Sequence, residues 1–176
     1  MDGVRVPINR PFIGDEEAKA VAEVLKEASL TSSSYDGGKK VREFERALAT
    51  YLKVRDVVAV NSGTSALLAS LMACGIGQGD EVILPSFTFA ATANAVRACG
   101  ASIVFADINL EDYCIDPEDV KAKITDRTKA IIPVDLYGNT SRIDEINEIA
   151  KPKNIAVIED AAQSLGSMDN GSYAGT

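Results

Sequence analysis

From Val57 onward, short runs of β-branched and other apolar residues alternate with stretches of helical pattern. Five of these runs are predicted strands: VVAV (57–60), EVILP (81–85), SIVFAD (102–107), AIIPVDL (130–136) and IAVIED (155–160). Helices are predicted between them at roughly 64–74, 89–99, 117–124 and 142–150. This alternation predicts successive βα units around a parallel sheet, which is an α/β fold.

Two of these helices carry recognisable start signals. Asp116 precedes Pro117, which places a capping side chain and a proline at the first helical position. Ser141 with Asp144 resembles a capping box for the helix at 142–150.

The organisation of the chain predicts one domain that is incomplete. The first 52 residues contain two amphipathic stretches, 15–29 and 39–53, separated by the polar loop TSSSYDGG. A length of 176 residues, with no internal repeat or linker, predicts a single compact unit over residues 1–176. The tail MDNGSYAGT is turn-rich, and no further strand or second domain follows to cover the sheet. We therefore expect a partial domain of a larger fold.

Composition excludes several classes of function. The formal net charge is −8 and the basic residues are scattered, so a nucleic-acid partner is not expected. The absence of histidine excludes a Ser-His-Asp triad, a Cys-His pair and a histidine metal site, and no metal is predicted. The three cysteines lack C-x-x-C spacing, which predicts reduced, packed thiols in a cytosolic protein. No signal peptide or long apolar run is present, so we expect a cytoplasmic protein without a membrane partner.

The first candidate binding segment follows the predicted strand VVAV. Asn61-Ser62-Gly63-Thr64-Ser65 leads into the helical run ALLASLMA, which brings backbone amides to a helix N-terminus and suits a phosphate group. An ordinary capped helix start is the alternative. The segment is neither G-x-G-x-x-G nor a P-loop, so a nucleoside-triphosphate site is not supported.

Two further segments follow strands whose carboxyl ends share one edge of the predicted sheet, where open α/β sheets bind ligands. Ser86-Phe87-Thr88-Phe89 offers an aromatic ring for the face of a planar ligand, although each phenylalanine alone is more commonly a core residue. In Glu159-Asp160-Ala161-Ala162-Gln163, a carboxylate could hold a protonated ring nitrogen. The alternative for Asp160 is a cap on the helix expected to follow. Together the three segments supply a phosphate cup, a stacking ring and a pyridine partner.

The string NSGTSALLASLMACGIGQGDEVILPSFTFAATANAVRACGASIVFADI, with KAIIPVDLYG and IEDAAQSLG, resembles the DegT/DnrJ/EryC1/StrS family of sugar aminotransferases that depend on pyridoxal phosphate (PLP). VREFERALATYLK and KITDRTKAII extend the resemblance over essentially the whole chain. It implies the large domain of the fold-type I aminotransferases, a three-layer α/β/α arrangement with a mostly parallel sheet, present here in part. It also implies a homodimer.

The resemblance assigns roles to six residues. Gly63, Thr64 and Ser65 match the phosphate cup, and Phe89 matches the aromatic residue over the cofactor ring. Asp160 matches the aspartate that pairs with the pyridine nitrogen, and Gln163 the side chain near the phenolic oxygen. The loop from Ser32 to Gly38 is expected near the sugar.

Two departures from the family pattern stand out. The lysine that forms the Schiff base and shuttles the proton is expected beyond Thr176, so this chain alone is predicted to be inactive. Lys129, Lys151 and Lys153 do not match its position. Asp135 stands where the family usually has histidine.

The function implied for the parent protein is transfer of an amino group from glutamate, through PLP, to a keto-sugar attached to a nucleotide. One alternative is a dehydratase or cyclitol aminotransferase of the same family. The other is a module that keeps the PLP cradle without catalysis.

Overall fold

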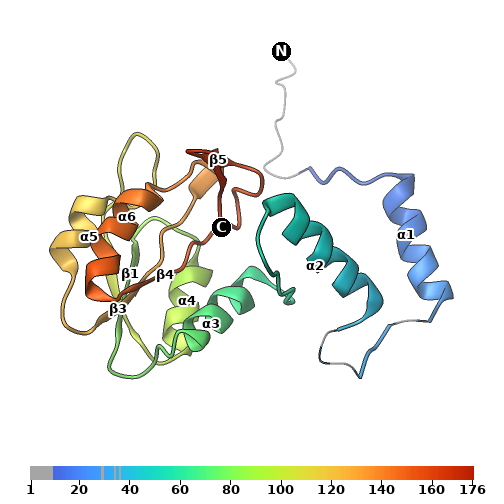
Figure 1. Ribbon diagram of the computed structural model, residues 1–176, viewed down its shortest axis with the longest axis horizontal. Helices are drawn as coiled ribbons and strands as arrows, with labels where there is room; N and C mark the ends of the chain where they lie inside the picture. Colours follow the sequence, from blue (N-terminus) through green and yellow to red (C-terminus); the bar gives the residue numbers. More distant parts are fainter. Residues whose placement is uncertain (1–9, 29, 34, 36) are drawn as a thin grey trace, which may run out of the picture. The chain divides into compact units, whose positions relative to one another are not determined.

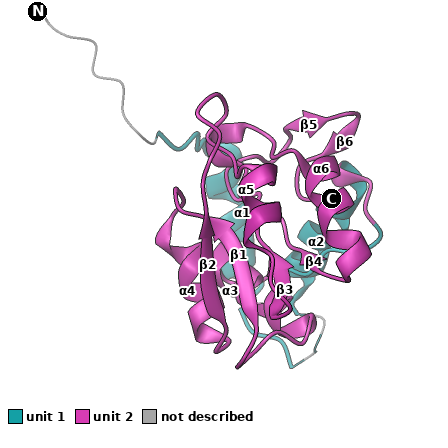
Figure 2. Ribbon diagram, turned by 90° about the vertical axis from the view of Figure 1, so that its left-hand side faces the viewer, with its two compact units in different colours: residues 1–51, 55–59 teal, residues 52–54, 60–176 magenta. Residues whose placement is uncertain are grey.

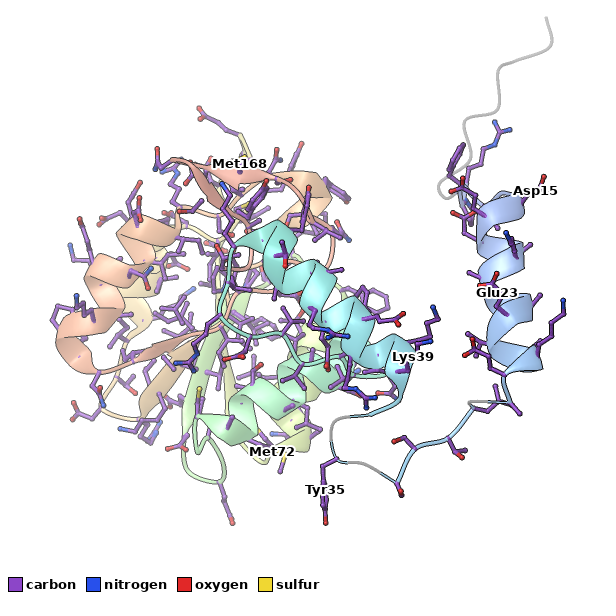
Figure 3. All side chains as sticks on the ribbon, turned by 45° about the vertical axis from the view of Figure 1, so that its right-hand side comes forward. Asp15, Glu23, Tyr35, Lys39, Met72 and Met168 are labelled. Carbon is purple, nitrogen blue, oxygen red and sulfur yellow. The ribbon has the colours of Figure 1, made fainter. Side chains whose placement is uncertain are left out.

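The computed structural model describes residues 10–28, 30–33, 35 and 37–176. The chain forms two compact units, residues 1–51 with 55–59 and residues 52–54 with 60–176 (Figure 2). The smaller unit contains α1 (Asp15–Lys26) and α2 (Lys39–Leu52), whose first residues are marked in Figure 3. Both predicted N-terminal helices are thus confirmed. The prediction of one domain over the whole chain stays a prediction.

The larger unit is built on a four-stranded parallel sheet. Its strands are β1 (Glu81–Pro85), β2 (Ser102–Ala106), β3 (Thr128–Ile131) and β4 (Ala156–Val157), in the order β2-β1-β3-β4. The helices are α3 (Gly63–Ala73), α4 (Ala90–Ala98), α5 (Pro117–Lys123) and α6 (Ile143–Ala150). Short 3-10 turns, η1 (Leu136–Gly138) and η2 (Lys151–Lys153), and a hairpin of β5 (Met168–Asp169) and β6 (Ser172–Tyr173) complete it.

Side-chain alternation along the strands creates a core on each face of the sheet. Val82 and Leu84 belong to one core, together with Leu71 of α3 and Val96 of α4. Ile83, between them in sequence, belongs to the other core, which α5 and α6 complete. Helices therefore cover both faces (Figure 1), as predicted for a three-layer α/β/α fold.

The predicted strand at residues 57–60 is wrong, because this segment is not assigned to any strand. A strand requires a neighbour for its backbone hydrogen bonds, and no described residue pairs with this run as a strand. The N–H of Ala59 is bonded instead to the Glu45 carboxylate, at 2.8 Å from Oε1. Val58 is 79% exposed, so the apolar run lacks the burial that strand pairing would bring.

The two predicted helix starts had different outcomes. The Asp116 cap is confirmed, because its carboxylate accepts a hydrogen bond from the N–H of Glu118 at 3.1 Å and Pro117 begins α5. The Ser141 capping box is wrong, because α6 begins at Ile143 and Arg142 is its N-cap. Ser141 lies one residue too early, and its N–H is bonded to a buried carboxylate described below.

Candidate functional site

A cavity of about 250 Å³ lies at the carboxyl edge of the sheet. The chain leaves β1 toward β2 on one side and later returns to β3 on the other, and ligands bind at such a reversal of strand order. The wall combines the start of α3 with the segments that follow β1, β3 and β4, and its lining residues are Gly63, Thr64, Leu67, Thr88, Phe89, Ala91, Val134, Leu136, Asp160, Ala162 and Gln163.

The start of α3 contributes backbone amides to this wall. Ser62 is the N-cap, and its hydroxyl accepts a hydrogen bond from the N–H of Ser65 at 3.2 Å. Gly63 and Thr64 line the cavity, whereas Ser65 stands one residue deeper in the helix and is not part of the wall. A Cβ at Gly63 would meet no atom within 4 Å, so a larger side chain there would project into open space beside the wall. Amides at a helix start next to open space fit an anionic group.

Phe89 is exposed at the cavity wall rather than packed in the core. It is the N-cap of α4, and 75% of its surface is accessible. Phe87 is 45% exposed and does not line the cavity. The core interpretation therefore holds for neither ring, and Phe89 is the one placed to cover a planar ligand.

Asp160 is fixed at the cavity by hydrogen bonds to both of its carboxylate oxygens and by its backbone. Its backbone forms a parallel bridge with Val134 beyond the end of β3. Carboxylate Oδ2 accepts a hydrogen bond from Thr92 Oγ1 at 2.8 Å, and Oδ1 accepts a longer one from the N–H of Ala162 at 3.4 Å. The helix expected after Asp160 is wrong, because residues 161–167 form turns. Asp160 therefore caps a turn, and one carboxylate edge remains at the cavity.

Gln163 presents the amide end of its side chain in a defined orientation. Its Oε1 accepts a hydrogen bond from the N–H of Tyr137 at 2.8 Å. Tyr137 lies in η1 with a φ of +59°. Because Oε1 is used by the backbone, the Nε2 amide group is the part available to a ligand in the cavity.

The neighbouring carboxylate, Glu159, lies on the other side of the same segment. It lines two other cavities, one of which it shares with Asp144 and Asn147 of α6. Adjacent residues of an extended strand point to opposite faces, which separates Glu159 from Asp160. Of these two adjacent carboxyl groups, only that of Asp160 lines the cavity at the edge of the sheet.

The buried Asp135 and the partly buried Glu159 form an interacting pair that the sequence did not reveal. Asp135 is fully buried, and its two oxygens accept hydrogen bonds from Ser141 N–H at 2.8 Å and Ser164 Oγ at 3.0 Å. Burial, together with the hydrogen bond and charge of Asp135, raises the pKa of Glu159 to about 8. Beside Asp135, the carboxyl group of Glu159 therefore favours its protonated form.

Other expectations concern thiols, metals and the N-terminal loop. The three cysteines are free, and burial raises the pKa of the Cys114 thiol. The prediction of packed thiols is wrong for Cys74, which is exposed. Within the described ranges there is no cluster of three acidic or cysteine side chains suited to a metal ion, and no helix there is both long and apolar enough to span a membrane. The loop from Ser32 to Gly38 lies partly outside the described residues and belongs to the smaller unit, so its contact with a sugar stays a prediction.

Comparison with known proteins shows the family to which this chain is similar. The family model described as the DegT/DnrJ/EryC1/StrS aminotransferase family matches residues 11–176. A 3-oxo-glucose-6-phosphate:glutamate aminotransferase of Bacillus subtilis (strain 168) is 41% identical, covering 96% of this chain and 38% of the relative. A GDP-perosamine synthase of Caulobacter vibrioides is also 41% identical, covering 98% and 45%. The chain thus spans less than half the length of these relatives.

Solved structures show the same fold. A GDP-4-keto-6-deoxymannose-3-dehydratase, solved with a trapped PLP-glutamate geminal diamine, superposes with a TM-score of 0.88 at 32% identity. The match covers 98% of this chain and 45% of the dehydratase. The parallel sheet and the cavity at its carboxyl edge thus define an α/β protein of the fold-type I aminotransferase class. Within that class, the chain belongs to the DegT/DnrJ/EryC1/StrS aminotransferase family.

Proposed function

We propose that this chain is the cofactor-binding portion of an aminotransferase that uses PLP to place an amino group on a sugar. One observation carries the proposal. Gly63, Thr64, Phe89, Asp160 and Gln163, which lie far apart in the sequence, line one cavity. The family resemblance had selected these residues for a single cofactor.

The shape and polarity of the cavity fit that cofactor. Open space lies beside Gly63 at the start of α3, and the amides of this helix start would hold the phosphate, with the helix dipole adding favourable potential. Phe89 would cover one face of the ring, and Asp160 would pair with the ring nitrogen. Gln163 Nε2 would donate to the phenolic oxygen, since Oε1 is already bonded to Tyr137. When bound, PLP supplies an electron sink for the reacting carbon.

The names of the relatives support a sugar as the amino acceptor and glutamate as the donor. Each of the three relatives reported above is named for a sugar, and two are named or solved with glutamate. Attachment of the sugar to a nucleotide is part of the proposal, supported by the two GDP-sugar proteins. The higher identity to the two aminotransfer relatives, 41% against 32% for the dehydratase, favours amino transfer over dehydration.

The lysine that would carry the covalent step is proposed to lie beyond Thr176 in the parent protein. Lys129, Lys151 and Lys153 are all exposed, and none lines the cavity. Lys129 donates to the backbone oxygen of Asp126, at the opposite end of β3 from the cavity. This chain is accordingly expected to bind the cofactor but to give no turnover. The homodimer expected from the resemblance stays a prediction.

Binding of pyridoxamine 5′-phosphate (PMP) tests the proposal, because this amine form needs no lysine. We expect the chain to bind PMP in calorimetric titration and to bind pyridoxamine, which lacks the phosphate, much more weakly. Asp160→Asn should weaken PMP binding about 10- to 100-fold, the effect of losing a hydrogen bond to a charged group. Asp126→Asn, an exposed carboxylate at the far end of β3, is the matched control.

Equal affinities for PMP and pyridoxamine would contradict the phosphate cup. An Asp160→Asn variant that binds PMP as the wild type does would contradict the pyridine pairing. Steady amino transfer by this chain alone would contradict the placement of the lysine beyond Thr176.

A further inference from the structure

Two hydroxyl groups form a hydrogen-bonded chain to Asp160, from Thr88 in the cavity wall through the buried Thr92. Thr92, in the first turn of α4, is fully buried and does not line the cavity. Its Oγ1 lies 2.8 Å from Asp160 Oδ2 and 3.0 Å from Thr88 Oγ1. Residues 68 positions apart in sequence are thereby joined by one side-chain contact.

The chemistry of the groups fixes the direction of this chain. A carboxylate only accepts hydrogen bonds, so the single hydroxyl proton of Thr92 points to Asp160. Thr92 Oγ1 can then only accept from Thr88, and the Thr88 proton points to Thr92. The order of donation is Thr88 to Thr92 to Asp160, and no other assignment satisfies all three groups.

Because Thr92 is fully buried, its hydroxyl group would destabilise the folded chain if it had no hydrogen-bond partner. Ala95 and Val96 of the same helix are buried core residues, and the fully buried site of Thr92 would also suit the similarly shaped valine. Thr92 therefore adds a polar group to a buried layer, and that group is bonded to the one carboxylate at the cavity wall. A hydrogen bond to a charged group is shorter and stronger than one between neutral groups, and it restricts the carboxylate plane.

We propose that Thr92 is a positioning residue that orients the Asp160 carboxylate toward the ring nitrogen of the cofactor, with Thr88 fixing the Thr92 hydroxyl. The inference rests on the proposed function, because it assigns a task to Asp160 within that site. Thr92 itself touches neither the cavity nor a ligand in it. The second, weaker contact of Asp160, at 3.4 Å to Ala162 N–H, does not fix the carboxylate plane alone.

The test compares PMP binding by four forms of this chain: the wild type, Thr92→Val, Thr92→Ser and Thr128→Val. Thr92→Val removes the hydroxyl while keeping the shape, and we expect about tenfold weaker binding of PMP. Thr92→Ser keeps the hydroxyl and should restore affinity. Thr128 is a matched control, because it is 3% exposed, its Oγ1 accepts a hydrogen bond from Thr125 N–H, and it lies at the far end of β3. Thr128→Val should bind PMP as the wild type does.

A spectroscopic readout separates positioning from a general structural effect. The near-ultraviolet absorption of bound PMP depends on whether its ring nitrogen is protonated. In Thr92→Val we expect the ring nitrogen of bound PMP to lose its proton at a lower pH than in the wild type. A tenfold weaker interaction between Asp160 and the protonated nitrogen corresponds to a pKa of that nitrogen lower by about one unit. Thr92→Ser and Thr128→Val should follow the wild-type curve.

The outcomes distinguish the two proposals. A wild-type chain that does not bind PMP overturns the proposed function and this inference with it. A wild type that binds PMP, with Thr92→Val indistinguishable from it or matched by Thr128→Val, overturns only the inference. If circular dichroism shows that Thr92→Val does not fold, Thr88→Val, which removes the outer donor, is compared with Thr88→Ser, which keeps the hydroxyl at this cavity-lining position. Equal affinity and absorption in these two variants overturn the inference.

Discussion

Replacement of Glu159 by glutamine should change how the stability of the chain depends on pH. The pKa of Glu159 is raised from 4.5 to about 8 by burial and by the adjacent Asp135 carboxylate. The folded chain therefore holds a proton that the unfolded chain releases near pH 4.5. The stabilising contribution of that proton is complete below pH 4.5 and is lost as the pH rises to about 8.

The size of the expected change in the free energy of unfolding follows from the binding of one proton. Where the folded state holds one proton more than the unfolded state, the free energy of unfolding falls by about 1.4 kcal/mol per pH unit. Between pH 6 and pH 8, with half of the proton lost at pH 8, the fall amounts to about 2 kcal/mol. Glu159 is partly exposed, and screening by water lowers the expected value to roughly 1–2 kcal/mol.

The chain is well suited to this measurement because it contains no histidine, the side chain that ordinarily titrates in this interval. Equilibrium urea unfolding, followed by circular dichroism at pH 6, 7 and 8, gives the free energies. Glu159→Gln mimics the protonated acid, so it should be as stable as the wild type at pH 6 and more stable at pH 8. Glu148→Gln, on the exposed face of α6, should retain the wild-type dependence. If the wild type and Glu159→Gln lose stability in parallel, the raised pKa is wrong.

Two further predictions concern the core and an ion pair. Leu71→Ala, at a fully buried position of α3, should lower the free energy of unfolding by about 2–5 kcal/mol in urea denaturation. Met72→Ala, at the exposed neighbour marked in Figure 3, should change it by less than about 0.5 kcal/mol. Equal losses in the two variants would contradict the packing of Leu71 in the core. Hydrogen bonds from Thr125 and Arg127 hold the pKa of Glu81 below its ordinary value, so its stabilising contribution should disappear as the pH falls below about 4.5. Glu81→Gln should therefore lose less stability than the wild type between pH 5 and pH 3, and unfolding curves that shift equally would refute this.

Elements that depend on local pattern were predictable from the sequence. The first and last residues of α3 to α6 fall within about one residue of the predicted ranges. Capping residues and helical periodicity are features of a few neighbouring residues, so the sequence alone reveals them. The segment at 57–60 has equally strong β composition but no partner strand within the described part of the chain. Pairing depends on residues distant in sequence, so composition alone could not decide it.

The cavity residues were predictable for a related reason. Phe89, Asp160 and Gln163 follow strands, and parallel strands deliver their carboxyl ends to one edge of the sheet. Thr92 was not predictable, because it lies within a helix and nothing near it in sequence indicates a contact with a residue 68 positions away. Family resemblance flagged Asp135 as unusual, and only its burial and hydrogen bonds showed what it contacts.

Asp160 and Glu159 show how one strand end can hold two carboxyl groups in different states. Strand alternation sends Asp160 to the cavity, where its side chain accepts hydrogen bonds from Thr92 and the Ala162 N–H. The same alternation sends Glu159 to a partly buried position beside Asp135, where burial and the contact with Asp135 favour the neutral acid. If both side chains faced the cavity, their mutual repulsion would raise the pKa of one of them and weaken any pairing with a protonated ring. Separating them across the strand therefore leaves Asp160 as the single acidic side chain in the wall of this cavity, so no second carboxyl group competes for the ring nitrogen of the proposed cofactor.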